Sequence, residues 1–149
     1  MEMFFTSKQA AEITGCTLRQ LQYWREKEVI VPVVKATGTG RSVYYSKSDL
    51  VQLALMKSWL SVGLSFEVAR EILKTLKDRE VEFSNFDRAN RFMLRLDSAK
   101  QVSSGETGLK LKLVEFDLEQ AIALLKEGQP IIPVWLDAIH QRLENTGRV

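Results

Sequence analysis

Two helix-start signals in close succession constrain the fold of this chain more than any other feature. Thr6 precedes Gln9 by three residues, and Thr17 precedes Gln20 by the same spacing. Each pair fits a capping box, in which a Thr hydroxyl and a Gln amide satisfy backbone groups at a helix N-terminus. Gly15 lies between the pairs and suits the left-handed conformation that ends a helix. The pattern predicts two short helices joined by a tight turn, a helix-turn-helix.

The second predicted helix, over about residues 17–27, has an apolar and a polar side. Leu18 and Leu21 are expected to anchor it in the core. The polar side carries residues at i, i+3, i+4 and i+7: Arg19, Gln22, Tyr23 and Glu26. A merely solvated helix face would look the same, but an arginine and a central tyrosine are also typical of a helix that reads a major groove.

A β-hairpin is predicted next. The runs 31–35 and 41–45 are rich in Val and Tyr and flank a turn that contains two glycines. A hairpin after a helix-turn-helix is a wing. Lys35 and Arg41 flank its turn, where wing bases usually contact phosphate.

Two longer helices follow the hairpin. Ser46 with Asp49 predicts the start of the first, Gly63 its end, and Ser65 the start of the second. Their apolar residues recur every three or four positions, which predicts core packing: Leu50, Leu53, Met56, Leu60, Val68, Ala69, Ile72, Leu73 and Leu76.

These motifs, in this order, resemble the MerR family of transcription regulators. Residues 17–24 (TLRQLQYW) are similar to its recognition helix, residues 44–50 to its wing exit, and residues 63–65 to its helix junction. The resemblance covers about residues 4–77, roughly half of the chain.

The resemblance implies where DNA is contacted. Arg19 and Tyr23 fall at family DNA contacts, Arg41 at a wing contact to the backbone, and Lys57 near a phosphate contact. The complete set of candidate DNA-binding residues is Thr17, Arg19, Gln20, Gln22, Tyr23, Arg25, Lys35, Arg41, Tyr44, Tyr45 and Lys57.

Three positions depart from the family pattern. Gln22 stands where an arginine is usual, Trp24 replaces a second tyrosine, and Arg25 replaces an acid. We therefore expect a different base preference.

The second half predicts a small α+β module. Residues 91–96 and 109–116 alternate as strands around a polar loop, and Asp117 caps a helix. Pro130 and Pro133 bound a short link before a last helix. The predicted fold class is thus α+β: a winged helix-turn-helix domain over 1–79, and a domain over 80–149 with a two-stranded antiparallel hairpin and two helices.

A two-stranded hairpin with two short helices is barely stable alone. We therefore expect residues 80–149 to pair with the same module of a second chain, giving a homodimer with two recognition helices on an inverted repeat. In the alternative, the module packs back on its own winged domain.

The charge is uneven in the direction that DNA binding requires. Residues 1–79 carry twelve Lys and Arg against eight Asp and Glu, a net charge of +4, and the remainder carries −2. The basic half is expected to meet double-stranded DNA.

Other chemistry has little support in the sequence. One cysteine, Cys16, and one histidine, His140, are too few for an ordinary metal site or a disulfide framework. Cys16 is expected to be a buried packing residue, and His140 a helix-surface or interface residue. We expect no cofactor and no enzymatic activity. Without a signal peptide or a long apolar run, the chain is expected to be cytoplasmic and not in a membrane.

The predicted function is sequence-specific transcription regulation, with repression by occlusion of a promoter. A MerR-like head with an α+β tail is similar to the cyanobacterial repressors of CRISPR-associated transposons, the Cas V-K repressor type. Two alternatives remain: an excisionase-like architectural protein that bends DNA, and a MerR-type sensor gated by a small molecule.

Overall fold

The computed structural model describes residues 3–37, 40–84, 90–97 and 111–147. Within them the chain is mixed α/β, with six helices and two antiparallel three-stranded sheets. The predicted fold class is confirmed.

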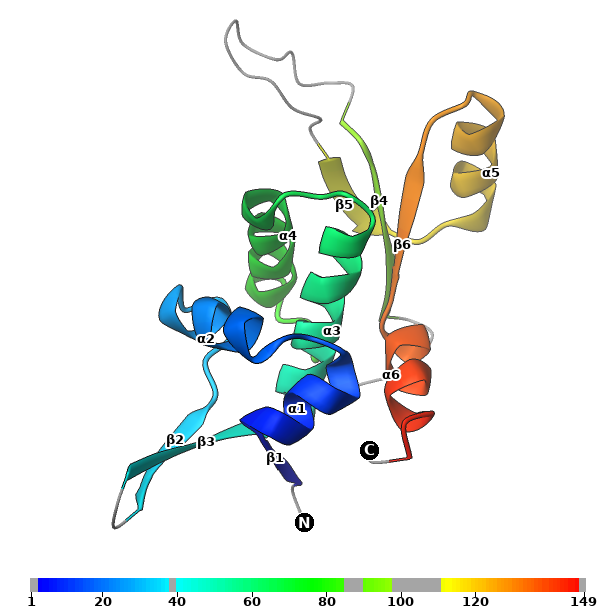
Figure 1. The fold of residues 1–149 in the computed structure, drawn as a ribbon. Coiled ribbons are helices and arrows are strands. Elements are labelled where there is room, and N and C mark those ends of the chain that lie inside the picture. Colours follow the sequence, from blue (N-terminus) through cyan, green and yellow to red (C-terminus); the bar gives the residue numbers. More distant parts are fainter. Residues whose placement is uncertain (1–2, 38–39, 85–89, 98–110, 148–149) are drawn as a thin grey trace, which may run out of the picture. The chain divides into compact units, whose positions relative to one another are not determined.

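The chain divides into two compact units (Figure 1). The first combines residues 1–86 with 136–149, and the second consists of residues 87–135. The second unit is thus an insertion between two segments of the first.

The first unit contains the predicted N-terminal elements together with one further short strand and the last helix of the chain. They are β1 (Phe4–Thr6), α1 (Ser7–Thr14), α2 (Leu18–Glu26), β2 (Val33–Thr37), β3 (Gly40–Ser46), α3 (Lys47–Ser61), α4 (Phe66–Asp78) and α6 (Leu136–Glu144). Both predicted capping boxes are present, and Ser46 and Ser65 cap α3 and α4 as expected.

The first sheet has the strand order β1-β3-β2. The hairpin β2–β3 was predicted, whereas the three-residue strand β1 was not. β1 pairs with the end of β3, so that Phe5 lies opposite Tyr45, and both side chains are buried. A strand this short has too few residues for its alternation to be recognised in the sequence.

Helix α3 is the centre of the first core. Its side chains are buried on nearly all sides, including Leu50, Leu53, Leu55, Met56 and Trp59. Helices α1, α4 and α6 all contact it. A helix that is apolar all round needs partners on all sides, which explains why three helices surround α3.

The last helix differs from expectation. The predicted division at residue 80 placed it in the second domain, but α6 packs on α3 of the first unit. Leu136, Ile139 and Leu143 are buried along one side of α6. This apolar stripe requires a complementary surface, and α3 supplies it although it lies about 80 residues earlier in the chain.

The second unit is a three-stranded sheet with one helix. It contains β4 (Arg91–Leu96), β5 (Leu111–Glu115), α5 (Leu118–Lys126) and β6 (Ile131–Trp135), with strand order β5-β4-β6. The predicted hairpin is β4–β5. The predicted link between Pro130 and Pro133 is instead a third strand, in which Pro133 lies opposite Met93. A proline is tolerated there because β6 is an edge strand.

Candidate nucleic-acid interface

Helix α2 is fixed in the first unit by two buried side chains. Leu21 and Trp24 are both 2% exposed, whereas Leu18 is 57% exposed. The expectation that Leu18 anchors the helix was therefore wrong. Leu21 and Trp24 together define the buried side, and Leu18 lies one turn before Gln22 on the outer side.

The outer side of α2 forms one open depression. It is lined by Thr17, Arg19, Gln20, Gln22, Tyr23 and Glu26. The amide Nε2 of Gln22 donates a hydrogen bond of 3.1 Å to Oε1 of Glu26. The structure thus brings five of the predicted site residues (all but Glu26) onto one surface of α2.

The start of this surface is set by the capping box. The backbone N–H of Gln20 donates to Oγ1 of Thr17, and the backbone N–H of Thr17 donates to Oε1 of Gln20, each at 3.0 Å. These two side chains therefore fix the position at which α2 begins, whatever else they contact.

Tyr23 is positioned by aromatic packing. Its side chain is 42% exposed, and its ring lies 5.1 Å from that of Phe66, between centroids, at an interplanar angle of 57°. The Nζ of Lys27 lies 5.7 Å from the same ring. Phe66 is a residue that the sequence analysis missed. It begins α4, and no local pattern signals its contact with α2.

The wing brings Lys35 and Arg41 close together along the backbone. Lys35 lies opposite Ser42, and Arg41 opposite Ala36, near the end of the hairpin where Thr37 pairs with Gly40. The side chains of Lys35 and Arg41 lie outside those that the structure describes. Their predicted contacts with phosphate remain a prediction.

The two wing tyrosines have different environments. Tyr44 is half-buried, while Tyr45 has no exposed surface. Consecutive strand residues point to opposite faces, and the face of Tyr45 is the core. Burial raises the pKa of Tyr45, opposed by the nearby Arg25 guanidinium. The assignment of Tyr45 as a DNA contact is corrected: it is a core residue. Arg25, half-buried beside it, lies partly inside the fold.

Two lysines donate hydrogen bonds to backbone carbonyl oxygens just after the ends of α1 and α2. The Nζ of Lys57 on α3 donates to the carbonyl oxygen of Gly15 at 2.5 Å, and the Nζ of Lys77 on α4 donates to that of Val29 at 2.6 Å. Burial lowers the pKa of Lys77, with Asp49 opposing the shift. The predicted phosphate contact of Lys57 is untested, but a structural contact of this residue is clear.

Cys16 lies in the turn between α1 and α2 and is 5% exposed. Its Sγ lies 3.7 Å from the carbonyl oxygen of Leu53, to which it can donate. Burial raises the pKa of the thiol, although the Thr14 hydrogen bond and Lys57 lower it. The predicted packing role is confirmed.

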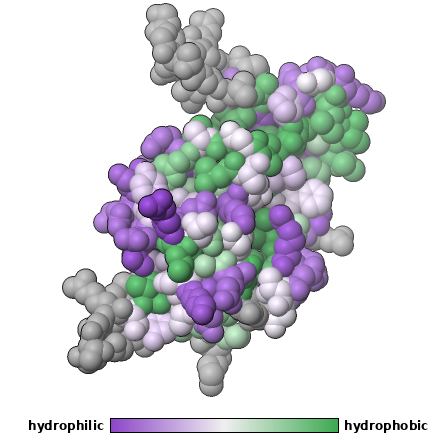
Figure 2. Space-filling view, viewed as in Figure 1, coloured by the Kyte–Doolittle hydropathy of each residue, from purple (hydrophilic) through white to green (hydrophobic). Residues whose placement is uncertain are grey.

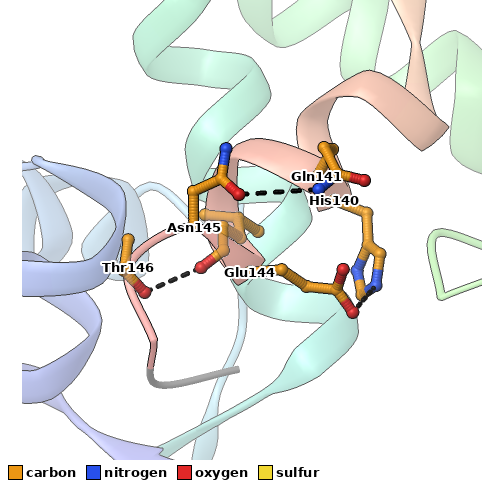
Figure 3. Close-up of polar contacts among 6 residues, drawn as sticks. His140, Gln141, Glu144, Asn145 and Thr146 are labelled. Carbon is orange, nitrogen blue, oxygen red and sulfur yellow. Dashed lines mark hydrogen bonds and ion pairs between the residues drawn. The ribbon is translucent and has the colours of Figure 1, made fainter.

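The end of α6 shows a local polar network (Figure 3). The Nε2 of His140 lies 2.9 Å from Oε1 of Glu144, and Nε2 of Gln141 donates to Oδ1 of Asn145 at 3.5 Å. Oγ1 of Thr146 donates to the carbonyl oxygen of Leu143 at 2.7 Å. One ring nitrogen of His140 thus contacts a carboxylate one turn later on the same helix.

Within the described residues, no three His, Cys, Asp or Glu side chains are grouped as metal ligands. None of the helices described is long and apolar enough to cross a membrane.

Comparisons with known proteins match the first half of the chain. Residues 5–76 match the protein family described as "MerR HTH family regulatory protein". A stretch of 74 residues is 35% identical to uncharacterised HTH-type transcriptional regulators of Mycobacterium bovis and Mycobacterium tuberculosis. The match covers 49% of this chain and 33% of the relatives, so the chain spans one third of their length.

Two solved structures were also matched over about half of this chain. One is HiNmlR, a MerR family regulator lacking the sensor domain, bound to promoter DNA, at 24% identity and a TM-score of 0.43 over 51% of this chain and 56% of that chain. Another is a MerR family transcriptional regulator from Bacillus cereus, at 22% identity and a TM-score of 0.42 over 54% of this chain and 63% of that one.

Proposed function

Because residues 5–76 match the MerR HTH regulatory protein family, we propose that the chain is a MerR-type, sequence-specific DNA-binding transcription regulator. The observation that carries this proposal is the outer surface of α2, where Arg19, Gln22 and Tyr23 are exposed together. Recognition helices of helix-turn-helix proteins present such a surface to base edges in the major groove.

The residues divide into two roles. Arg19, Gln22 and Tyr23 are proposed to contact bases, because they lie along the exposed side of the helix. Arg41 and Lys35 are proposed to contact phosphates from the wing, and Lys57 from α3. Leu18 joins the first group, since an apolar side chain exposed at the start of a recognition helix can meet the methyl group of thymine.

The proposed mechanism is repression by a homodimer. Two copies place two recognition helices on an inverted repeat that overlaps a promoter, and the bound dimer occludes RNA polymerase. A single small winged domain contacts only one half-site, which gives weak binding. The mechanism includes no catalytic step and places the protein in the cytoplasm with its DNA.

A footprint on the DNA upstream of the protein's own gene and its neighbours, at two salt concentrations, tests this function. We expect a protected inverted repeat that overlaps promoter elements and persists at the higher salt. Protection that is uniform and lost at the higher salt would contradict sequence-specific repression. Tandem protected sites with strong bending would favour an architectural role.

A further inference from the structure

Helix α5 exposes three large apolar side chains on one side. Leu118 is 62% exposed, Ile122 44% and Leu125 59%. Their spacing of four and three residues puts them in a single stripe along the helix. Ala121 and Leu124, on an adjacent side, are the buried residues of α5. Figure 2 shows hydrophobic residues gathered in the region where Figure 1 places α5.

The charges beside this stripe have opposite signs at its two ends. Glu119 lies in the first turn of α5 and Lys126 in the last. They are seven residues apart, so both lie on the same flank of the stripe. Ile122 lies almost midway between Glu119 and Lys126, and between Leu118 and Leu125.

The α5 stripe and its flanking charges are complementary to those of a second copy whose α5 runs in the opposite direction. A two-fold axis close to Ile122 would place Leu118 near Leu125 of the second copy. The same axis would place Glu119 of each copy near Lys126 of the other copy, which gives two oppositely charged pairs. In a parallel two-fold pair this flank would lie on opposite sides of the two copies, so Glu119 and Lys126 would not meet each other across the interface. Two-fold symmetric interfaces use the same patch on both subunits, which this pattern permits.

We propose that the α5 stripe is covered by the α5 stripe of a second copy of this chain, in antiparallel orientation. This inference deepens the proposed function, because it assigns the surface that joins the two DNA-binding units. Stable interfaces bury about 800 Å² per partner. A nine-residue helix supplies only part of that area, so we expect a dimer that forms at micromolar concentrations.

Cross-linking tests the position of the axis. The variant Ile122→Cys is expected to form a disulfide-linked dimer under mild oxidation, because a residue near a two-fold axis meets its own counterpart. Val62→Cys is the matched control, since Val62 is also exposed, at 58%, in the turn after α3. The wild-type protein is the control for any cross-linking through Cys16, which is buried. Equal cross-linking of both variants, or none of Ile122→Cys, would overturn the proposed axis.

Charge reversal tests the identity of the partner. By sedimentation, Glu119→Lys and Lys126→Glu are each expected to weaken self-association several-fold, since each creates two like-charged pairs. The double variant is expected to recover, and so is an equimolar mixture of the two single variants. No loss in the single variants, or no recovery in the mixture, would contradict an antiparallel second copy and point to a different occupant of the stripe.

The variant Ile122→Glu separates this inference from the proposed function. A monomer that retains the melting temperature of wild type and still binds one half-site would support both. If the Ile122→Glu variant still forms the dimer and gives an intact footprint, the α5 interface is overturned and the proposed function stands. If the wild-type protein forms the dimer but protects no DNA, the proposed function is overturned and the α5 interface stands. If Ile122→Glu fails to fold, the exposed charge variants supply the same test.

Discussion

At the scale of single residues, Tyr23 is held from two sides. Phe66 packs against its ring and Lys27 lies over it, while 42% of the side chain stays exposed. A side chain that already has few alternative positions loses little conformational entropy when it binds, which suits the base contact proposed for Tyr23. Cys16, in contrast, is buried at the turn before α2 and fills space.

Tyr23→Ala is expected to weaken operator binding by ~1–3 kcal/mol, the usual contribution of a base contact, and random DNA binding by less. Tyr23→Phe is the matched control, because it retains the ring against Phe66 and removes only the hydroxyl. Fluorescence titration on operator and scrambled duplexes measures both. An equal loss on both duplexes for Tyr23→Ala would contradict its role in reading bases.

Cys16 is expected to react slowly with a disulfide reagent at pH 8 in the native protein, and quickly in urea. Burial blocks access and raises the pKa of the thiol, so the native state holds less of the reactive thiolate than the unfolded state does. The exposed thiol of Val62→Cys provides the rate for an accessible site. Similar native and unfolded rates for Cys16 would show that the turn is open.

At the scale of elements, hydrogen-bonded caps set where several helices of the first unit begin. Thr6 and Thr17 make the same capping box at α1 and α2, yet only α2 carries the candidate reading surface. Gly15 ends α1 at a φ of 77° and is held by Lys57. These elements allow paired comparisons.

Thr6→Ala and Thr17→Ala are each expected to cost about 1 kcal/mol of unfolding free energy, the usual effect of losing an N-cap. Operator affinity should fall clearly only for Thr17→Ala, because the cap of α2 fixes the start of the reading surface. Urea unfolding and operator titration separate the two effects. Equal losses of affinity would mean that stability alone governs binding.

Gly15→Ala is expected to destabilise the fold more than Gly63→Ala. Both glycines have positive φ values, 77° and 98°, where an alanine costs about 1–2 kcal/mol. Only at Gly15 would the new Cβ collide, with the ammonium group of Lys57. The difference should disappear in a Lys57→Ala background, as measured by urea unfolding; a persisting difference would exclude Lys57 as its cause.

At the scale of the whole molecule, local and distant interactions explain what could be predicted from the sequence. Capping boxes and the hairpin depend on residues a few positions apart, so all of them were predictable. The burial of Tyr45, the exposure of Leu18, and the strand that contains Pro133 depend on neighbours from other elements. The position of α6 depends on α3, about 80 residues earlier. No local pattern encodes such partners.

The proposed dimer also predicts how binding responds to salt. If each unit neutralises about three phosphates, the dimer neutralises about six, and log K should fall against log salt with a slope of about −5. The Ile122→Glu variant should show about half that slope. Titrations between 50 and 200 mM salt, concentrations at which such contacts are sensitive, measure both slopes. Equal slopes would indicate that the same number of phosphates is contacted with and without an intact α5 stripe.

The packing of α6 on α3 also has a consequence for how the protein is made. Chains are synthesised at about 5–20 residues per second. The ribosome therefore needs roughly 3–12 s to pass from the end of α4 through the inserted unit to the start of α6. During this interval the surface of α3 that receives α6 lacks its cover. We expect the first unit to become resistant to proteolysis only after the second unit and α6 have been translated.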